Sequence, residues 1–215
     1  MISTKQIYSR ICDDFDRSRT KMWPCVRRFL SIPTCKNVLD IGCGNGKNMI
    51  FPGIPEITFK GVDFCPEFVD ICRKKGLDVT EADMTSLPFP DEKFDGVMAV
   101  ASYHHLDNDT DRTKALREMY RVLKNGGVGM IVVWAKEQED DSRFVFDSGV
   151  KTSAFGWDEY VEWKLKKKDS YESYKRYYHV YRKGDLENEI MMLCPEFHVV
   201  SVEWEKGNWI ALLRK

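Results

Sequence analysis

The sequence predicts an α/β fold with a mostly parallel sheet, and three observations lead to this prediction. An apolar run that contains Val38, Leu39 and Ile41 enters a turn with glycine at every second position. Strand-like and helix-like stretches then alternate as far as residue 133, an order typical of parallel sheets with helical crossovers. The chain closes on two strand-like runs around the turn at 205–208, which predicts a terminal antiparallel hairpin.

Length and composition narrow the class of protein. The 215 residues are enough for one domain with a substantial core, so we treat 1–215 as a single domain. The net charge of −1 argues against a generally basic surface, so any contact with nucleic acid must use local patches. Seven cysteines without a C-x-x-C pair predict reduced thiols, no metal site in this chain, and a cytoplasmic or nuclear location. No apolar run is long enough to span a membrane.

The glycine turn indicates the class of ligand. Glycines permit backbone conformations that a Cβ forbids, and they let a ligand approach the main chain. The dinucleotide fingerprint is G-x-G-x-x-G, but here the glycines are Gly42, Gly44 and Gly46, and Asp40 precedes the first by two residues. This D-x-G-x-G-x-G pattern resembles that of the class I S-adenosylmethionine (SAM)-dependent methyltransferases. The resemblance implies that these four residues bind SAM; the alternative is a tight turn in a domain that binds no nucleotide.

The same resemblance implies a class I methyltransferase (Rossmann-like) fold: a mostly parallel seven-stranded sheet, a C-terminal antiparallel hairpin, and helices on both faces. We expect strands at 36–41, 58–63, 77–82, 94–100, 128–133, 197–205 and 208–213, and helices at 66–75, 109–124 and 184–193. Residues 1–35 are a predicted helical preface of the kind that closes over the cofactor. We interpret 139–183 as a substrate-side insertion, of which 139–175 is expected to be a loop or partly ordered.

Two further acidic positions follow predicted strands. Asp63 ends the second strand, where an acid can accept hydrogen bonds from both ribose hydroxyls. The alternative role of Asp63 is a helix N-cap, because Pro66 follows at a plausible first-turn position. In this fold the residue pair after the third strand holds the adenine edge, and Asp83 and Met84 occupy that place.

Several more motifs occur together in this chain. They are Leu-Pro-Phe at 87–89, Tyr-His-His-Leu at 103–106, Val-Val-Trp-Ala-Lys-Glu-Gln at 132–138, Arg-Tyr-Tyr-His-Val-Tyr-Arg at 176–182, Asn-Trp at 208–209 and the preface segment 18–24. In combination they resemble the eukaryotic tRNA wobble-uridine carboxymethyl methyltransferases over nearly the whole chain, least over 139–170. The resemblance implies esterification of a carboxymethyl group on C5 of the anticodon wobble uridine. It also implies a small zinc-binding activator subunit as partner, which we expect at the exposed edge of the strand at 77–82.

The chemistry of such an ester explains the expected site residues. A carboxylate is ionised at neutral pH, so it can attack the sulfonium methyl group without a general base once it is held in line. We expect Arg19, His105 and Arg176 to hold it; the alternatives are surface ion pairs and a core histidine. Predicted contacts to the tRNA anticodon loop involve Lys21, Trp23, His104, Trp134, Tyr177, Tyr178, His179, Arg182 and the basic run 164–168.

The loop after the fourth strand argues against one class of acceptor. Methyltransferases that act on base amines carry an Asn/Asp-Pro-Pro-aromatic motif there, whereas this chain has Ala-Ser-Tyr-His-His-Leu at 101–106. Pyrimidine C5 methyltransferases need a nucleophilic cysteine, usually beside a proline, and here the Cys65-Pro66 pair follows the wrong strand. Oxygen acceptors therefore remain. Two alternatives stay open beside the tRNA enzyme: a small-molecule carboxyl or hydroxyl methyltransferase, and a catalytically silent SAM-binding regulator.

Overall fold

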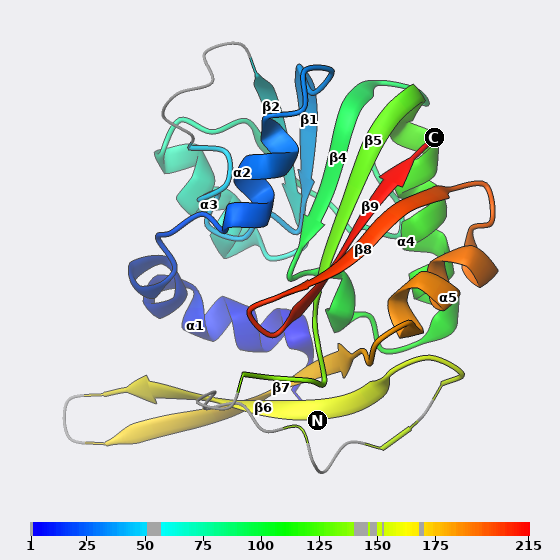
Figure 1. Ribbon diagram of the computed structural model, residues 1–215. Coiled ribbons are helices and arrows are strands. Elements are labelled where there is room, and N and C mark those ends of the chain that lie inside the picture. The colour runs from blue at the N-terminus through cyan, green and yellow to red at the C-terminus, as the bar shows by residue number, and fades with distance from the viewer. Residues whose placement is uncertain (1, 51–56, 140–145, 147–149, 152, 168–169) are drawn as a thin grey trace.

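The computed structural model describes residues 2–50, 57–139, 146, 150–151, 153–167 and 170–215. Among these residues, seven strands form one sheet in the order β3-β2-β1-β4-β5-β9-β8 (Figure 1). The strands are β1 (Asn37–Ile41), β2 (Thr58–Asp63), β3 (Val79–Glu81), β4 (Phe94–Val100), β5 (Leu123–Trp134), β8 (His198–Glu205) and β9 (Asn208–Arg214). The first five are parallel, and β9 is antiparallel to both β5 and β8. This confirms the predicted sheet and its terminal hairpin.

The chain order reverses at β1, which lies between β2 and β4. The crevice beyond the carboxyl ends of strands at such a reversal is the usual ligand site of open α/β sheets. Val38, Leu39 and Ile41 are fully buried, because both faces of the sheet are covered. The glycine turn that follows β1 therefore opens directly into that crevice.

Helices cover both faces of the sheet, as predicted. On one face, α2 (Pro24–Leu30) packs Val26 and Phe29 against Val38 and Met98. On the other face, α4 (Asp109–Val122) and α5 (Asp185–Leu193) pack against apolar residues that include Leu39 and Ile131. The helix α3 (Pro66–Lys74) follows β2 and ends before Gly76, as the sequence indicates.

The preface begins with α1 (Thr4–Ser18), whose start has a reciprocal cap. The Ser3 hydroxyl accepts from the Gln6 backbone N–H, and the Gln6 side chain accepts from the Ser3 N–H. The buried face of α1, which includes Tyr8 and Ile11, packs against Phe68 of α3. The helix lies beside the end of the sheet at which the parallel strands terminate (Figure 1).

The insertion contains a second sheet, so the expected loop at 139–175 was wrong. Strands β6 (Trp157–Lys166) and β7 (Tyr171–Val180) form an antiparallel hairpin that lies next to α1 below the main sheet in Figure 1. The many charged residues of β6 concealed its period of two, in which Glu159 and Trp163 are buried and Tyr160 is exposed. Residues 140–145, 147–149, 152 and 168–169, also part of that expectation, lie outside the described residues, and Lys168 of the predicted basic run is among them.

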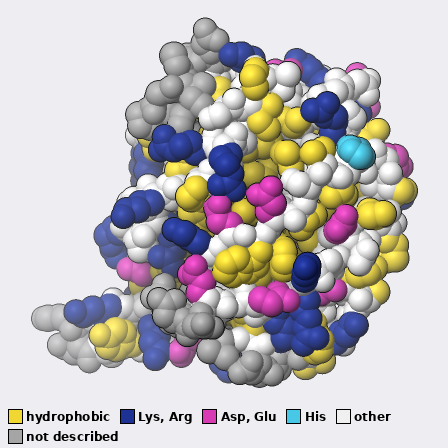
Figure 2. All heavy atoms as spheres, viewed as in Figure 1, with side chains coloured by type: hydrophobic (Ala, Val, Ile, Leu, Met, Phe, Trp, Pro, Cys, Tyr) yellow, Lys and Arg dark blue, Asp and Glu magenta, His cyan; other side chains and the backbone are white. Residues whose placement is uncertain are grey.

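The described surface mixes both signs of charge. Figure 2 shows lysine, arginine, aspartate and glutamate side chains interspersed on one face, in keeping with the net charge of −1. Within the described ranges, no helix has the length and apolar content needed to cross a membrane.

Candidate active site

One pocket lies where the preface, the ends of the parallel strands and the hairpin meet. Its lining includes Tyr8, Phe15, Arg19, Trp23, Gly42, Gly44, Asn45, Lys47, Asn48, Asp63, Asp83, Met84, Ser102, His104, His105, Trp134, Arg176 and Tyr178. Segments that are far apart in the sequence therefore contribute to a single site. The apolar side chains and the few charged groups in this wall are typical of a small-molecule or cofactor pocket.

Two of the three glycines of the turn face the pocket. Gly42 has a φ of +69° and packs so tightly on Ser102 that an added Cβ would overlap the serine side chain. Gly44 also lines the pocket. Gly46 does not, because its Cα faces Leu77 and Cys72. The structure thus gives Gly46 a packing role instead of a place beside a ligand.

Asn45 connects the glycine turn to the preface. Its amide Nδ2 donates to the backbone oxygen of Arg19 and to Oδ1 of Asp16, both at 2.9 Å. Lys75 donates to the backbone oxygen of Asn45 at 3.0 Å. These bonds hold the end of α1 over the pocket and place Arg19 in its wall. Sequence reasoning missed Asn45, although its position between two motif glycines was a signal.

Asp40 lies beneath the pocket floor with no exposed surface. Asn48 donates to its Oδ2 at 3.5 Å, and Asp40 Oδ1 and Asn48 Oδ1 have no hydrogen-bond partner among the described residues. Burial raises the pKa of Asp40 to about 7, against the opposing effects of Asn48 and Lys47. Two buried acceptors without donors, one of them in the pocket wall, fit a ligand that carries a cationic N–H group.

Asp63 is held in the wall by backbone donors. Its Oδ2 accepts from Gly44 N at 2.8 Å and its Oδ1 from Cys65 N at 2.9 Å. Burial nevertheless raises its pKa to about 6. The N-cap residue of α3 is Cys65, so the alternative role of Asp63 as the helix cap was wrong. Each carboxylate oxygen keeps a second lone pair for a ligand hydroxyl.

The chain turns sharply after β4, at Ala101, whose φ of +55° is rare for a residue with a side chain. This turn leads into the 3-10 segment η1 (Tyr103–His105) and places both histidines in the pocket wall. The backbone N–H of Trp134 donates to Nδ1 of His104 at 3.1 Å. Burial lowers the pKa of His104 well below its usual value and that of His105 to about 3, so both rings are neutral at physiological pH.

Arg176 is the most unusual group in the wall. Only 4% of it is exposed, and none of the ion pairs found among the described residues includes it. Its Nη1 donates to the Tyr8 hydroxyl at 3.4 Å, and its Nε has no hydrogen-bond partner in the described part of the chain. A buried charge without a counter-ion is costly, so the pocket favours an anion at this place.

Comparisons with known proteins agree with this geometry. Residues 39–131 match the family model of a methyltransferase domain. A tRNA (carboxymethyluridine(34)-5-O)-methyltransferase of Schizosaccharomyces pombe is 32% identical over 227 residues, which cover 98% of this chain and 95% of that relative. The chain belongs to this family. The predicted resemblance is thereby confirmed, and the protein is a SAM-dependent methyltransferase with SAM as its cofactor.

Two further matches define how far the likeness extends. A relative of the same name from Arabidopsis thaliana is 41% identical over 139 residues, which are 64% of this chain but 34% of that protein. This chain therefore spans about a third of that relative. A SAM-dependent methyltransferase of Clostridium acetobutylicum has a TM-score of 0.66 at 16% identity, over 97% of this chain and 98% of that one. At this identity the structural likeness shows the fold.

Only some of the residues predicted to hold the carboxylate or to contact tRNA line the pocket. The pocket wall includes Arg19, Trp23, His104, His105, Trp134, Arg176 and Tyr178, and it does not include Lys21, Tyr177, His179 or Arg182. Trp134 stacks on Tyr178, with ring centroids 4.2 Å apart and planes at 8°. Arg182 is exposed and lies over the ring of Trp157, 4.4 Å from its centroid.

For two of these residues the predicted contact with tRNA was wrong. His179 has no exposed surface, and its Nδ1 is 2.8 Å from Oδ1 of Asp158. The Tyr177 hydroxyl donates to the same Asp158 oxygen at 2.7 Å, and only 9% of this tyrosine is exposed. Asp158 lies in β6, so both bonds connect the two strands of the hairpin, on the face opposite to Arg176 and Tyr178.

Proposed function

We propose that this enzyme esterifies the carboxymethyl group on C5 of the wobble uridine in the tRNA anticodon, with SAM as methyl donor. The observation that carries the proposal is Arg176, a buried guanidinium in the pocket wall without a carboxylate partner among the described residues. An ionised carboxymethyl group supplies the missing negative charge, and guanidinium groups bind carboxylates with charge-assisted hydrogen bonds. The acceptor named for the S. pombe relative supports the same choice.

The residues around the glycine turn are suited to hold SAM. In this proposal Gly42 and Gly44 allow SAM to approach the main chain closely. The cationic methionine end of SAM is received by Asn48 and by Asp40 beneath it. Asp63 accepts from the ribose hydroxyls. Asp83 and Met84 bind the adenine edge; Asp83 is oriented by Thr85, whose N–H and hydroxyl donate to Oδ1 at 2.8 and 2.7 Å. When bound, SAM supplies an electrophilic methyl group.

The remaining task of the chain is to orient the acceptor. Arg19 and Arg176 hold the carboxylate, and the neutral rings of His104 and His105 add no competing positive charge. No proton is removed, because the carboxylate is already ionised at physiological pH. Tyr8, Phe15 and Tyr178 form apolar walls that exclude water from the reacting oxygen.

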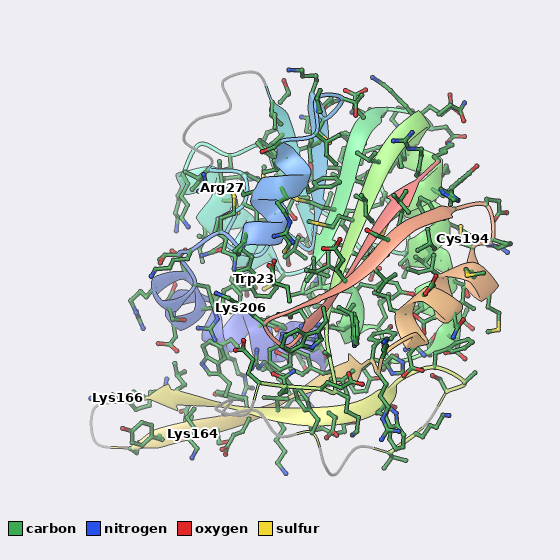
Figure 3. The ribbon with its side chains drawn as sticks, viewed as in Figure 1. Trp23, Arg27, Lys164, Lys166, Cys194 and Lys206 are labelled. Carbon is green, nitrogen blue, oxygen red and sulfur yellow. The ribbon has the colours of Figure 1, made fainter. Side chains whose placement is uncertain are left out.

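The outer face of the hairpin is suited to the RNA. The outer hairpin face is defined here as Tyr160, Lys164, Lys166, Tyr171 and Lys175. All five side chains are exposed, with Tyr160 at 53% and Tyr171 at 68%. Lys166 lies opposite Tyr171 in the ladder. Figure 3 shows Lys164 and Lys166 toward the free end of the hairpin. Interleaved lysines and aromatic rings provide phosphate contacts and base stacking.

A partner subunit is the last part of the proposal. The strand β3 lies at one end of the described sheet and has three residues, so its outer edge can pair with another chain. We expect the small zinc-binding activator to dock there. Loss of activity when the activator is left out supports this part, and full activity without it contradicts it.

The deciding experiment is transfer of a tritiated methyl group from SAM to bulk tRNA from cells that lack the wobble esterifying enzyme. It is run with and without the activator, and with the unsubstituted enzyme beside Arg176→Gln. We expect base-labile label on the wobble uridine with both proteins present, and a large loss with the variant. Tight SAM binding without label on tRNA contradicts the proposal. Label on a small acid instead would favour the small-molecule alternative, and no turnover at all would favour the silent regulator.

A further inference from the structure

Trp163 of β6 has a defined environment for which the sequence held no prediction. Only 8% of it is exposed, and its Nε1 donates to Oδ2 of Asp14 in α1 at 3.1 Å. Its ring stacks near that of Phe15, with centroids 6.1 Å apart and planes at 28°. The indole therefore joins the hairpin to the preface, next to the pocket but outside its lining.

Two arginines of the pocket wall share this ring. The Cζ atom of Arg19 lies 5.1 Å from the centroid of Trp163, and that of Arg176 lies 4.7 Å from it. Both distances are within the range of cation–π attraction, for which indole is the strongest aromatic partner. Each guanidinium group is positively charged and is attracted to the negative π-face of the indole.

We propose that Trp163 is a positioning residue, which holds Arg19 and Arg176 so that both guanidinium groups address one acceptor carboxylate. This inference rests on the proposed function and adds a residue to it. The arginines come from two separate segments, the end of α1 and the middle of β7. Trp163 contacts both of them and is itself anchored by a hydrogen bond to α1.

The nature of the side chain sets the expected effects of substitution. Trp163→Leu keeps an apolar side chain in the core but removes the ring face from both arginines. Trp163→Phe keeps a smaller ring and removes the hydrogen bond to Asp14. A cation–π contact changes an equilibrium constant by a few-fold when it is exposed and by about thirtyfold when it is desolvated. We therefore expect the rate of methyl transfer to fall about tenfold for Trp163→Leu and about threefold for Trp163→Phe.

The test uses the full chain with its activator subunit and unmethylated tRNA, under single-turnover conditions at saturating SAM. Trp204→Phe is the matched control, because Trp204 is 41% exposed on β8 and lies outside the pocket. SAM affinity is measured by calorimetry for every variant. We expect the Trp163 variants to methylate tRNA more slowly and to keep a SAM dissociation constant within twofold of that of the unsubstituted enzyme. The control should match the unsubstituted enzyme in both measurements.

A combination of substitutions separates positioning from a general structural role. If Trp163 acts through the arginines, Trp163→Phe costs clearly less in an Arg176→Gln background than in the unsubstituted enzyme. An equal loss in both backgrounds, or no loss in either, overturns the inference. If the leucine variant does not fold, the phenylalanine pair decides. Failure of the unsubstituted enzyme to methylate tRNA would instead contradict the proposed function, so the two failures are distinct.

Discussion

The hydroxyl of Tyr8, in the first helix, lies 2.8 Å from Nε2 of His105, a residue 97 positions later in the chain. The other ring nitrogen, Nδ1, lies 2.8 Å from the backbone oxygen of Tyr177. A carbonyl oxygen accepts only, so Nδ1 carries the proton of the neutral ring and Nε2 accepts from Tyr8. Arg176 in turn donates to the Tyr8 oxygen at 3.4 Å. The Tyr8 hydroxyl therefore accepts a hydrogen bond from Arg176 and donates one to His105.

The direction of these bonds predicts the tautomer of His105. We expect ¹⁵N chemical shifts that show a protonated Nδ1 and an unprotonated Nε2 from pH 6 to pH 8. Tyr8→Phe removes one hydrogen bond, worth about 1 kcal/mol, and we expect methyl transfer to slow about fivefold. Tyr120→Phe, outside the pocket, is the control. A protonated Nε2 would contradict this arrangement.

The low pKa values of the histidines predict a flat pH profile. Burial lowers the pKa of His105 to about 3, so the ring does not titrate near neutrality. A carboxylate acceptor likewise stays ionised above pH 6. We expect kcat with saturating SAM and tRNA to change less than twofold between pH 6 and pH 8. A decline below a midpoint near 6.5 that disappears in His105→Gln would show that the histidine acts as a base.

Asp63 predicts a pH dependence of cofactor affinity. Burial raises its pKa to about 6 in the free pocket, and hydrogen bonds from ribose hydroxyls favour the charged form. Binding therefore lowers this pKa, and affinity increases as pH rises through 6. We expect SAM to bind about tenfold more weakly at pH 5 than at pH 7.5.

The matched variants for that titration are Asp63→Asn and Asp70→Asn. The first should bind SAM weakly and with a smaller dependence on pH in calorimetry, the remainder arising from Asp40, whose pKa of about 7 lies in the same range. The second alters a carboxylate on α3 whose side chain is 67% exposed, and it should behave as the unsubstituted enzyme. An unchanged pH dependence in Asp63→Asn would assign the titration to another group.

Glu189 predicts a large effect on stability. It is 1% exposed, accepts from the hydroxyls of Tyr103 and Tyr181 at 2.9 Å, and lies 3.2 Å from Nε of the buried Arg112. Glu189→Ala leaves that arginine without its buried counter-charge, so we expect the free energy of unfolding to fall by about 3–5 kcal/mol. In urea titrations the exposed Glu187→Ala should cost less than about 1 kcal/mol. Similar midpoints for the two variants would refute the role of Glu189.

The outer hairpin face predicts a salt-dependent effect on tRNA binding. Replacing Lys164, Lys166 and Lys175 by alanine removes three exposed positive charges. We expect weaker tRNA binding at low salt, with SAM affinity unchanged. The slope of the logarithm of the binding constant against the logarithm of salt concentration should become shallower by about one for each phosphate that is no longer neutralised. Lys114→Ala, an exposed position on α4, is the control. Equal slopes for the triple variant and the control would remove this face from the RNA interface.

The cofactor half of the fold was predictable because its signals are local. The apolar residues of β1, the motif glycines and the Pro66–Gly76 helix limits depend on neighbours a few positions away. The hairpin was not predicted, although a signal existed: Trp157, Val161, Trp163 and Leu165 recur at alternate positions of β6. The charged residues between them were interpreted as a loop, whereas they are the exposed side of a strand.

By itself the sequence determined the parallel sheet, the glycine turn and the class of cofactor, since each follows from short-range spacing. Only the tertiary structure decided which residues of the Arg-Tyr-Tyr-His segment face the pocket. The pleat of β7 turns Arg176 and Tyr178 toward the pocket and turns Tyr177 and His179 toward Asp158. Tyr8, His105 and Arg176 meet although they lie in three distant segments. Contacts of that kind depend on packing between elements, which no local pattern encodes.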